Sequence, residues 1–150
     1  MELFHTSPNK IEKVNQFGLF GECLCFSEKP YFMTAAADPV VYRIELDDSE
    51  IVEASTFFFR DDCDKLAGLV EEVMELVGCD EDTAQDLLAG TQALLDVADE
   101  FDYEMDFEIQ KLTGKAGKVL GFRAVETRDE QGAMWLVAMQ GHEQDLIEVE

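Results

Sequence analysis

The chain has 150 residues and a mass of 16.9 kDa, which is the size of one domain, and 47% of its residues are hydrophobic, enough for a buried core. It carries 34 Asp and Glu against 11 Lys and Arg, so its formal net charge at pH 7 is −23. This charge argues against non-specific binding to nucleic acid or to anionic lipid, since both need a surplus of Lys and Arg. It favours high solubility and attraction to a basic partner.

The sequence also argues against a membrane-spanning protein and against a disulfide-rich protein. The sequence has no run of about 20 apolar residues that could cross a membrane, and its first residues lack the basic and apolar regions of a signal peptide. We therefore expect a cytoplasmic protein. The four cysteines form no Cys-x-x-Cys pair, so we expect reduced, mostly buried thiols rather than a zinc site or a disulfide framework.

The N-terminal part of the chain is predicted to contain three strands and two short helical segments. Ser7 followed by Pro8 is typical of a helix start. Further along, Cys23 and Cys25 alternate with larger apolar residues, which places both thiols on one face of a strand. The predicted elements are strands over residues 2–5, 20–27 and 40–46, and a helix or helical turn over 10–14 and 30–37.

The middle of the chain is acidic and predicted to be mostly helical. Residues 47–108 hold 21 of the acidic residues and only two basic ones. Three sets of mostly apolar residues recur at helical spacing, and each set is predicted to form a stripe that faces the core. The acidic residues lie mostly on the opposite faces of these helices. The stripes are Leu66, Leu69, Val70, Val73 and Val77; Ala84, Leu87, Leu88, Thr91, Leu95 and Ala98; and Ile109, Leu112, Ala116, Val119 and Leu120. Gly78 and Gly121 are expected to end the first and third helices, and Asp80 to cap the second.

The C-terminal part is predicted to be a hairpin followed by an edge strand. Residues 122–128 and 133–140 alternate as strands on either side of a turn at Asp129–Gly132, and Leu146–Val149 predicts the last strand. Strands at both ends around a helical middle indicate a single α+β domain over residues 1–150, rather than regular βαβ alternation.

Few residues have a spacing that points to chemistry. The chain has no Gly-rich phosphate loop and no Gly-x-Ser-x-Gly elbow. His5 ends a predicted strand before a polar turn, where an imidazole and nearby backbone amides can hold a ligand hydroxyl; a packed or solvated histidine is the alternative. Asp129 and Glu130 lie at a tight turn between two hydrophobic strands, a position where acids also serve simply as turn formers.

Several short motifs occur in the order found in a known family. They are Leu3–Ser7, Gly18–Gly21, Leu24–Ser27, Tyr42–Ile44, Leu120–Val125 and Trp135–Val137. In this order they resemble the small ADP-ribosyltransferases. Met1–His5, Phe20-Gly21, Phe107–Leu112 and Val125–Leu136 are similar, more narrowly, to the anti-CRISPR ADP-ribosyltransferases that inactivate the type I-F surveillance complex.

The resemblance implies a fold, a co-substrate and residues that hold it. The implied fold is a split, mixed and antiparallel sheet core that carries a helical acidic insertion, and the implied co-substrate is NAD⁺, with no metal. His5 would hold the adenosine-side ribose, and Thr6 would present its backbone to the carboxamide. Tyr31 or Phe32 would stack on the nicotinamide.

The resemblance also implies a catalytic acid. Asp129 matches the essential acid of the anti-CRISPR group, and its neighbour Glu130 is the reserve candidate. Cleavage of the nicotinamide bond builds positive charge on the ribose, and a fixed carboxylate stabilises that charge. The same acid can orient or deprotonate the attacking side chain.

The implied function is mono-ADP-ribosylation of a host protein in the bacterial cytoplasm by a protein of a phage or mobile element. The target would be a type I-F CRISPR effector subunit at its DNA- or PAM-binding surface, with the acidic helices docked on basic residues and no direct contact with nucleic acid or membrane. Two alternatives are a non-catalytic acidic inhibitor of a basic, nucleic-acid-handling surface and a bacterial toxin or effector ADP-ribosyltransferase with another protein target.

Overall fold

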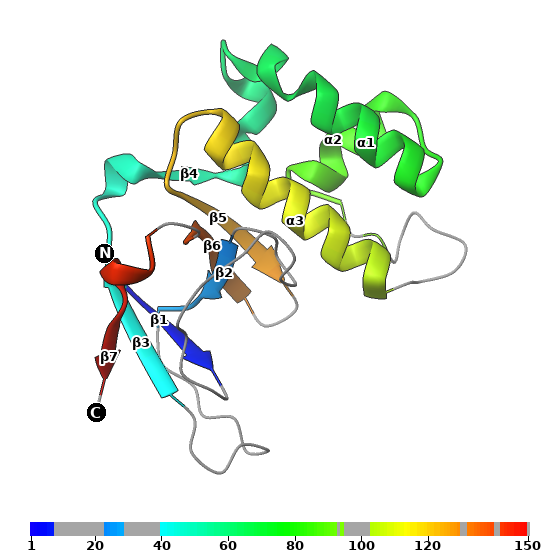
Figure 1. The fold of residues 1–150 in the computed structure, drawn as a ribbon. Helices are drawn as coiled ribbons and strands as arrows, with labels where there is room; N and C mark the ends of the chain where they lie inside the picture. Colours follow the sequence, from blue (N-terminus) through cyan, green and yellow to red (C-terminus); the bar gives the residue numbers. More distant parts are fainter. Residues whose placement is uncertain are drawn as a thin grey trace.

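A computed structural model describes residues 1–7, 23–28, 40–92, 94, 103–129, 132–139 and 142–149. The fold has two β-sheets and a layer of helices (Figure 1). The three-stranded sheet has the order β1 (Glu2–Ser7), β3 (Val40–Glu45), β7 (Ile147–Val149). The four-stranded sheet has the order β2 (Cys23–Phe26), β6 (Gly132–Ala138), β5 (Ala124–Asp129), β4 (Ile51–Glu53). Only β4 and β5 pair in parallel among these strands, so the described chain has the predicted α+β class with a mixed sheet.

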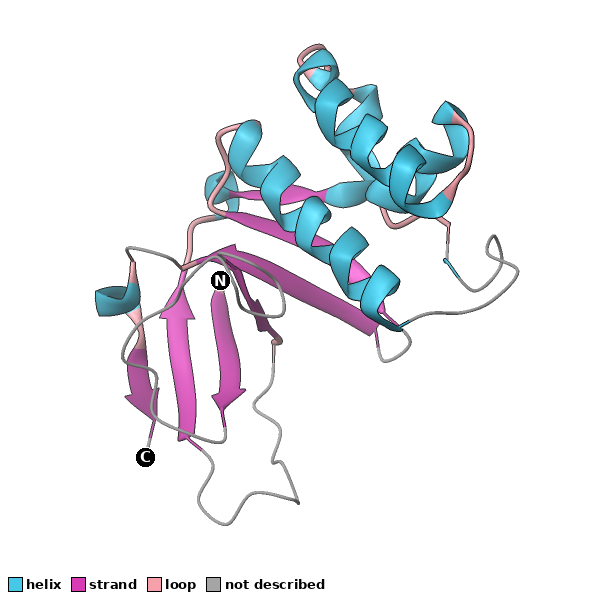
Figure 2. Ribbon diagram, turned by 45° about the vertical axis from the view of Figure 1, so that its right-hand side comes forward, coloured by secondary structure: helices cyan, strands magenta, loops and turns pink. Residues whose placement is uncertain are grey.

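The two sheets meet at the end of β2. There the backbone N–H of Phe4 donates to the carbonyl of Ser27, and the N–H of Ser27 donates to the carbonyl of Phe4, both at 2.8 Å. Apolar side chains from both sheets fill the space between them. These are Leu3, Phe26, Ile44, Leu46, Ala124, Trp135, Val137 and Met139. The four-stranded sheet therefore has one face on the smaller sheet and the other face on the helices (Figure 2).

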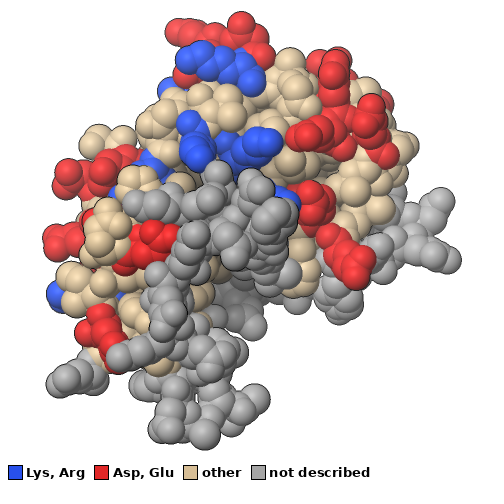
Figure 3. All heavy atoms as spheres, in the orientation of Figure 1, with Lys and Arg blue, Asp and Glu red and all other residues tan. Residues whose placement is uncertain are grey.

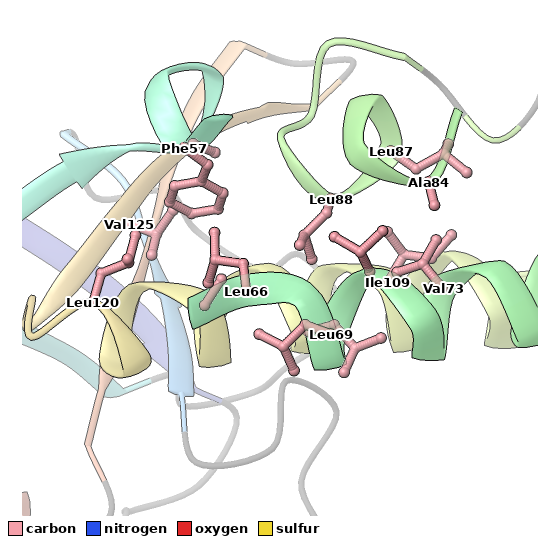
Figure 4. Packing of buried hydrophobic residues seen from close by; sticks show 14 of the residues in the cluster. Phe57, Leu66, Leu69, Val73, Ala84, Leu87, Leu88, Ile109, Leu120 and Val125 are labelled. Atoms are coloured by element: carbon pink, nitrogen blue, oxygen red, sulfur yellow. The ribbon is translucent and has the colours of Figure 1, made fainter. Parts of the chain in front are cut away.

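The helical layer consists of α1 (Ala67–Val77), α2 (Glu81–Leu88) and α3 (Tyr103–Val119). Short 3₁₀ helices cover Asp48–Glu50, Ala54–Phe59, Cys63–Leu66 and Glu143–Asp145. Figure 4 shows the predicted stripes meeting in one core, where Val73, Leu88 and Ile109 come from the three helices in turn. The predicted caps are confirmed, because Asp80 accepts a hydrogen bond from the N–H of Thr83 at 2.8 Å and Gly78 ends α1 in the left-handed conformation.

Two helix predictions are wrong in detail. The second helix ends at Leu88 rather than continuing through Thr91, because Gly90 adopts a φ of 73° and turns the chain. Leu95 and Ala98, which were assigned to the same stripe, lie outside the described residues. Val119 is 40% exposed instead of buried, since it is the last residue of α3.

The observed strands differ from the predicted ones at their ends and by one additional strand. Ser7 is the last residue of β1, opposite Val40, so this strand runs two residues beyond the predicted one. The helices predicted over 10–14, with Ser7 as the cap, and over 30–37 lie outside the described residues. Asp129 and Gly132, the two ends of the predicted turn, pair with each other, so they count as the last residue of β5 and the first residue of β6. The additional strand is β4, which no sequence pattern predicts. Its three residues are too few to show the alternation of a strand, and its partner β5 is distant in sequence.

Two other expectations concern membranes and thiols. Over the part of the chain described here, no helix is both long and apolar enough to span a membrane. All four cysteines are free thiols, but only Cys23 is buried, so the expectation of mostly buried thiols is wrong. Cys23 and Cys25 contribute to the same small apolar cluster, as the alternation predicted.

Gly117 sets how closely α3 approaches the sheet, and its replacement gives a test of this packing. A Cβ at Gly117 would overlap Cγ2 of Val125, a stiff β-branched side chain that is 1% exposed. We expect Gly117→Ala to lower the free energy of unfolding by about 1–3 kcal/mol in urea titrations. Gly68→Ala is the matched control, because a Cβ at Gly68 on α1 meets nothing within 4 Å. That variant should gain up to about 1 kcal/mol from helix propensity, and equal behaviour of the two variants would contradict the packing described.

Candidate active site

His5 lies on β1 and faces the four-stranded sheet. Its Nδ1 is 2.7 Å from the carbonyl oxygen of Cys25, and its ring centroid is 5.4 Å from that of Phe26, with the planes tilted by 44°. A carbonyl only accepts, so Nδ1 carries the proton and donates it. Burial lowers the pKa of His5, opposed by the Cys25 hydrogen bond, so the ring favours its neutral form. In this tautomer Nε2 is a hydrogen-bond acceptor, which suits a ligand hydroxyl.

Thr6 follows His5 on β1, and the role implied for it uses the backbone rather than the side chain. The side chain points to the opposite face of β1 from His5 and is 5% exposed. The N–H and C=O of Phe4 pair with Ser27, on the edge of β1 that faces away from β3. Because backbone groups alternate along an antiparallel strand, those of Thr6 face this same edge. The role implied for the Thr6 backbone, holding the carboxamide, stays a prediction.

The other predicted site residues are described only in part or not at all. Asp129 is the last residue of β5, and its backbone pairs with Gly132. Tyr31, Phe32 and Glu130 lie outside the described residues. The choice of nicotinamide-stacking aromatic, and the choice between the two acids, therefore remain predictions.

A row of side chains that sequence reasoning missed crosses the four-stranded sheet. Glu53 pairs with Glu126, Glu126 with Trp135, and Trp135 with Phe26, so the four strands each place one residue at the same level. His5 then packs on Phe26 at the end of this row. Glu126 follows Ala124 by two residues, so it lies on the face of β5 that packs toward the smaller sheet.

The two carboxyls in the row are coupled. Burial raises the pKa of Glu126 most, and the negative charge and hydrogen bond of Glu53 raise it further. The guanidinium of Arg128 lowers this pKa, and the carboxylate of Glu28 raises it. Glu126 therefore shares its surroundings with acids from β4 and from the segment after β2.

A metal site and a surface hollow are two other kinds of candidate site. Within the described ranges, no group of three or more His, Cys, Asp or Glu is arranged to hold a metal ion. A surface hollow of about 460 Å³ is lined by Phe59, Arg60, Asp61 and Asp62, none of which belongs to the row or to the predicted nucleotide site.

Comparison with known proteins identifies the class. A solved structure described as "Crystal structure of an anti-CRISPR protein" has the same fold, with a TM-score of 0.64 and 22% identity over 99% of this chain and 95% of that one. No curated protein sequence matches the chain. Residues 1–144 match the family described as "Anti-CRISPR Type I-F ADP-ribosyltransferase AcrIF11". The chain is thus an ADP-ribosyltransferase.

It belongs to the AcrIF11 family of anti-CRISPR type I-F ADP-ribosyltransferases, which confirms the resemblance found in the sequence. Membership in this enzyme class implies NAD⁺ as the co-substrate.

Proposed function

We propose that this protein transfers ADP-ribose from NAD⁺ to a subunit of a type I-F CRISPR effector complex, at its DNA- or PAM-binding surface, and so inhibits the complex in the bacterial cytoplasm. The observation that carries the proposal is the neutral His5, which presents an acceptor nitrogen beside Phe26 in a chain that matches the family over residues 1–144. A ribose hydroxyl donates to such a nitrogen without the cost of removing a charge from water.

Each predicted site residue has one part in this chemistry. His5 accepts a hydrogen bond from the adenosine-side ribose, and the backbone of Thr6 holds the carboxamide of the leaving nicotinamide. The bond between C1′ of the ribose and the nicotinamide nitrogen breaks, and a new bond forms from C1′ to a nucleophilic side chain of the target. The carboxylate of Asp129 stabilises the positive charge that develops on the ribose and orients the attacking group, whose proton passes to it or to solvent.

Charge supports a basic surface on the target. Acidic side chains crowd the edges of the helical layer in Figure 3, while Lys and Arg gather near the middle of that face. The exposed acidic residues on α1 and α2 are Glu71, Glu72, Glu75, Glu81, Asp82 and Asp86. Such a surface steers association with a basic partner and weakens as salt rises.

An exposed aromatic residue lies beside this acidic layer. Phe59 is 89% exposed and is the last residue of the 3₁₀ helix Ala54–Phe59. Next to it, Arg60 is held by Asp62 at 2.9 Å and lies over the ring of Phe122 at 4.9 Å. A large apolar side chain on an ordered, acidic segment is suited to anchor a protein contact.

A transfer assay tests this function. The protein is incubated with labelled NAD⁺ and purified type I-F effector subunits, and mass spectrometry locates any attached ADP-ribose. Transfer to a basic residue patch of one subunit supports the proposal. Inhibition without consumption of NAD⁺ would instead establish a non-catalytic inhibitor, and transfer only to other bacterial proteins would establish a different target.

Thermal unfolding tests the nucleotide site separately. A ligand that binds only the folded chain stabilises it by about 2.7 kcal/mol at 100 times its dissociation constant. We expect NAD⁺ to raise the melting temperature of the wild-type protein and to have no such effect on His5→Ala. A shift that survives in His5→Ala would show that the nucleotide binds elsewhere.

A further inference from the structure

Phe59 is the most exposed large apolar side chain in the part of the chain that the structure describes. It is 89% exposed, and the next in order, Ile147, is 50% exposed. Its two aromatic neighbours turn the other way, since Phe57 is fully buried in the helical core and Phe58 packs against that core. A single exposed apolar residue is ordinary, so the surroundings of Phe59 decide whether it marks a contact.

The turn that carries Phe59 is held in place by the residues that follow it. Arg60 donates from Nε to Asp62 at 2.9 Å, and its guanidinium lies 4.9 Å from the ring centroid of Phe122. The backbone N–H of Cys63 donates to the carbonyl of Arg60 at 3.3 Å. A segment that is already ordered loses little conformational entropy when it binds a partner. Phe59 therefore has the rigid, apolar character of an interface anchor.

A surface hollow of about 460 Å³ lies beside Phe59 and combines its ring with carboxylates. It is lined by Phe59, Arg60, Asp61 and Asp62. Asp62 is engaged by Arg60, whereas Asp61 is exposed. An Arg or Lys side chain packs its apolar stem or its cation on an aromatic ring while its charge faces a carboxylate. The hollow thus suits a basic side chain of a partner.

The charge around the hollow selects among the possible partners. Residues 53–72 contain six acidic residues against Arg60 and Lys65. Such a surface repels phosphates, anionic lipid and a second copy of a chain whose net charge is −23. It attracts a basic protein surface. A surface that binds DNA is of this kind, because Lys and Arg neutralise the phosphates.

The hollow lies away from the predicted nucleotide site. Phe57 belongs to the core on the helical side of the four-stranded sheet, whereas His5 belongs to the smaller sheet on the other side. In Figure 1 the segment between β4 and α1 lies at the top of the molecule, and β1 lies in the lower half. A protein bound at Phe59 therefore leaves the nucleotide site uncovered at this end.

We propose that Phe59 and the hollow beside it form a docking site for the target protein. The Phe59 ring packs on the target surface, and an Arg or Lys side chain of the target enters the hollow next to Asp61. This inference rests on the proposed function and deepens it, because it concerns how the target is recognised and not the chemical step.

Binding to the purified, intact type I-F effector complex tests the docking site. Biolayer interferometry without NAD⁺ measures the affinity before any modification alters the surface. Phe59→Ala should raise the Kd about tenfold or more, as expected for an aromatic anchor, whereas Phe59→Tyr keeps the ring and should retain most of the affinity. Asp61→Asn should weaken binding about two- to fivefold, with a smaller loss at high salt. Ile147→Ala removes an exposed apolar side chain on β7 and should match the wild type.

Two further measurements separate docking from nucleotide binding and from folding. Phe59→Ala should raise the KM for the target by the same factor as the Kd, and it should keep the rise in melting temperature that NAD⁺ produces. Because the side chain is 89% exposed, Phe59→Ala should also unfold at the wild-type temperature without ligand. A destabilised variant would mean that Phe59 serves the fold and would overturn the inference.

The remaining outcomes also decide the matter. Unchanged affinity in Phe59→Ala, or an equal loss in Ile147→Ala, overturns the docking site and leaves the proposed function intact. A wild-type dimer that dissociates in Phe59→Ala, seen by sedimentation velocity, assigns Phe59 to a second copy and overturns it as well. Loss of binding in Phe59→Ala, when the wild type binds without consuming NAD⁺, supports the docking site and contradicts the proposed transfer. A wild-type protein that neither binds nor modifies the complex overturns both.

Discussion

Replacing Asp129 by alanine is expected to lower the rate of ADP-ribose transfer by about 100-fold or more. The reason is that the reaction builds positive charge on the ribose, and a carboxylate held beside that charge is the strongest stabilising group the predicted site offers. Asp129 ends β5, where its backbone pairs with Gly132, and alanine can keep that pairing. Nicotinamide release under saturating NAD⁺ and target measures the rate.

Two further variants separate the roles of the acids. Asp129→Asn keeps the size of the side chain and removes its charge, so it should lose nearly as much activity as Asp129→Ala. Glu130→Gln should retain activity if Asp129 is the essential acid. Full activity of Asp129→Ala together with loss in Glu130→Gln would move the catalytic role to Glu130, and full activity in both would exclude an acid at this hairpin.

Replacing Trp135 by alanine should destabilise the fold by about 3–5 kcal/mol. Trp135 is 1% exposed and packs among side chains from both sheets, including Leu3 and Phe26, so its removal leaves a cavity at the junction of the sheets. A loss of this size is a large part of the roughly 5–15 kcal/mol that holds a domain folded. Because Trp135 is the single tryptophan, urea unfolding is followed by far-UV circular dichroism rather than by fluorescence.

Trp135→Phe is the matched variant. It keeps an aromatic ring in the core and removes an indole N–H that has no partner within the described structure, so no acceptor is left unpaired. We expect a much smaller loss of stability than for Trp135→Ala. An equal loss in the two variants would mean that the N–H, and not the apolar bulk, carries the contribution of Trp135.

Local sequence patterns predicted the elements whose signals are short-range. The β-branched run that begins at Val40 predicts β3, and the stripe from Leu66 to Val77 with Gly78 behind it predicts α1 and its end. The second helix was predicted too long because the apolar spacing continues past Gly90, while the left-handed conformation of that residue turns the chain. Periodicity alone does not report where such a turn interrupts a helix.

The sequence predicted those residues of the candidate site that have a known place in the family motifs and missed the row across the four-stranded sheet. His5 and Thr6 are predicted from their place in a motif order, and the roles implied for them stay predictions. The neutral state of His5 required the fold, since it follows from burial and from the carbonyl of Cys25. Glu126 was one acid among 34 in the sequence, and nothing in its local pattern names Glu53 as its neighbour.

The sequence by itself determined the family, the α+β class and the high negative charge, because motif order, periodicity and composition are properties of the chain alone. Only the tertiary structure decided that β4 joins β5 in parallel, and that Glu53, Glu126, Trp135 and Phe26 stand at one level. The register between strands that are distant in sequence depends on which faces the two sheets and the helices bury together. That assembly turns an acidic residue of a short strand into the neighbour of a candidate nucleotide site.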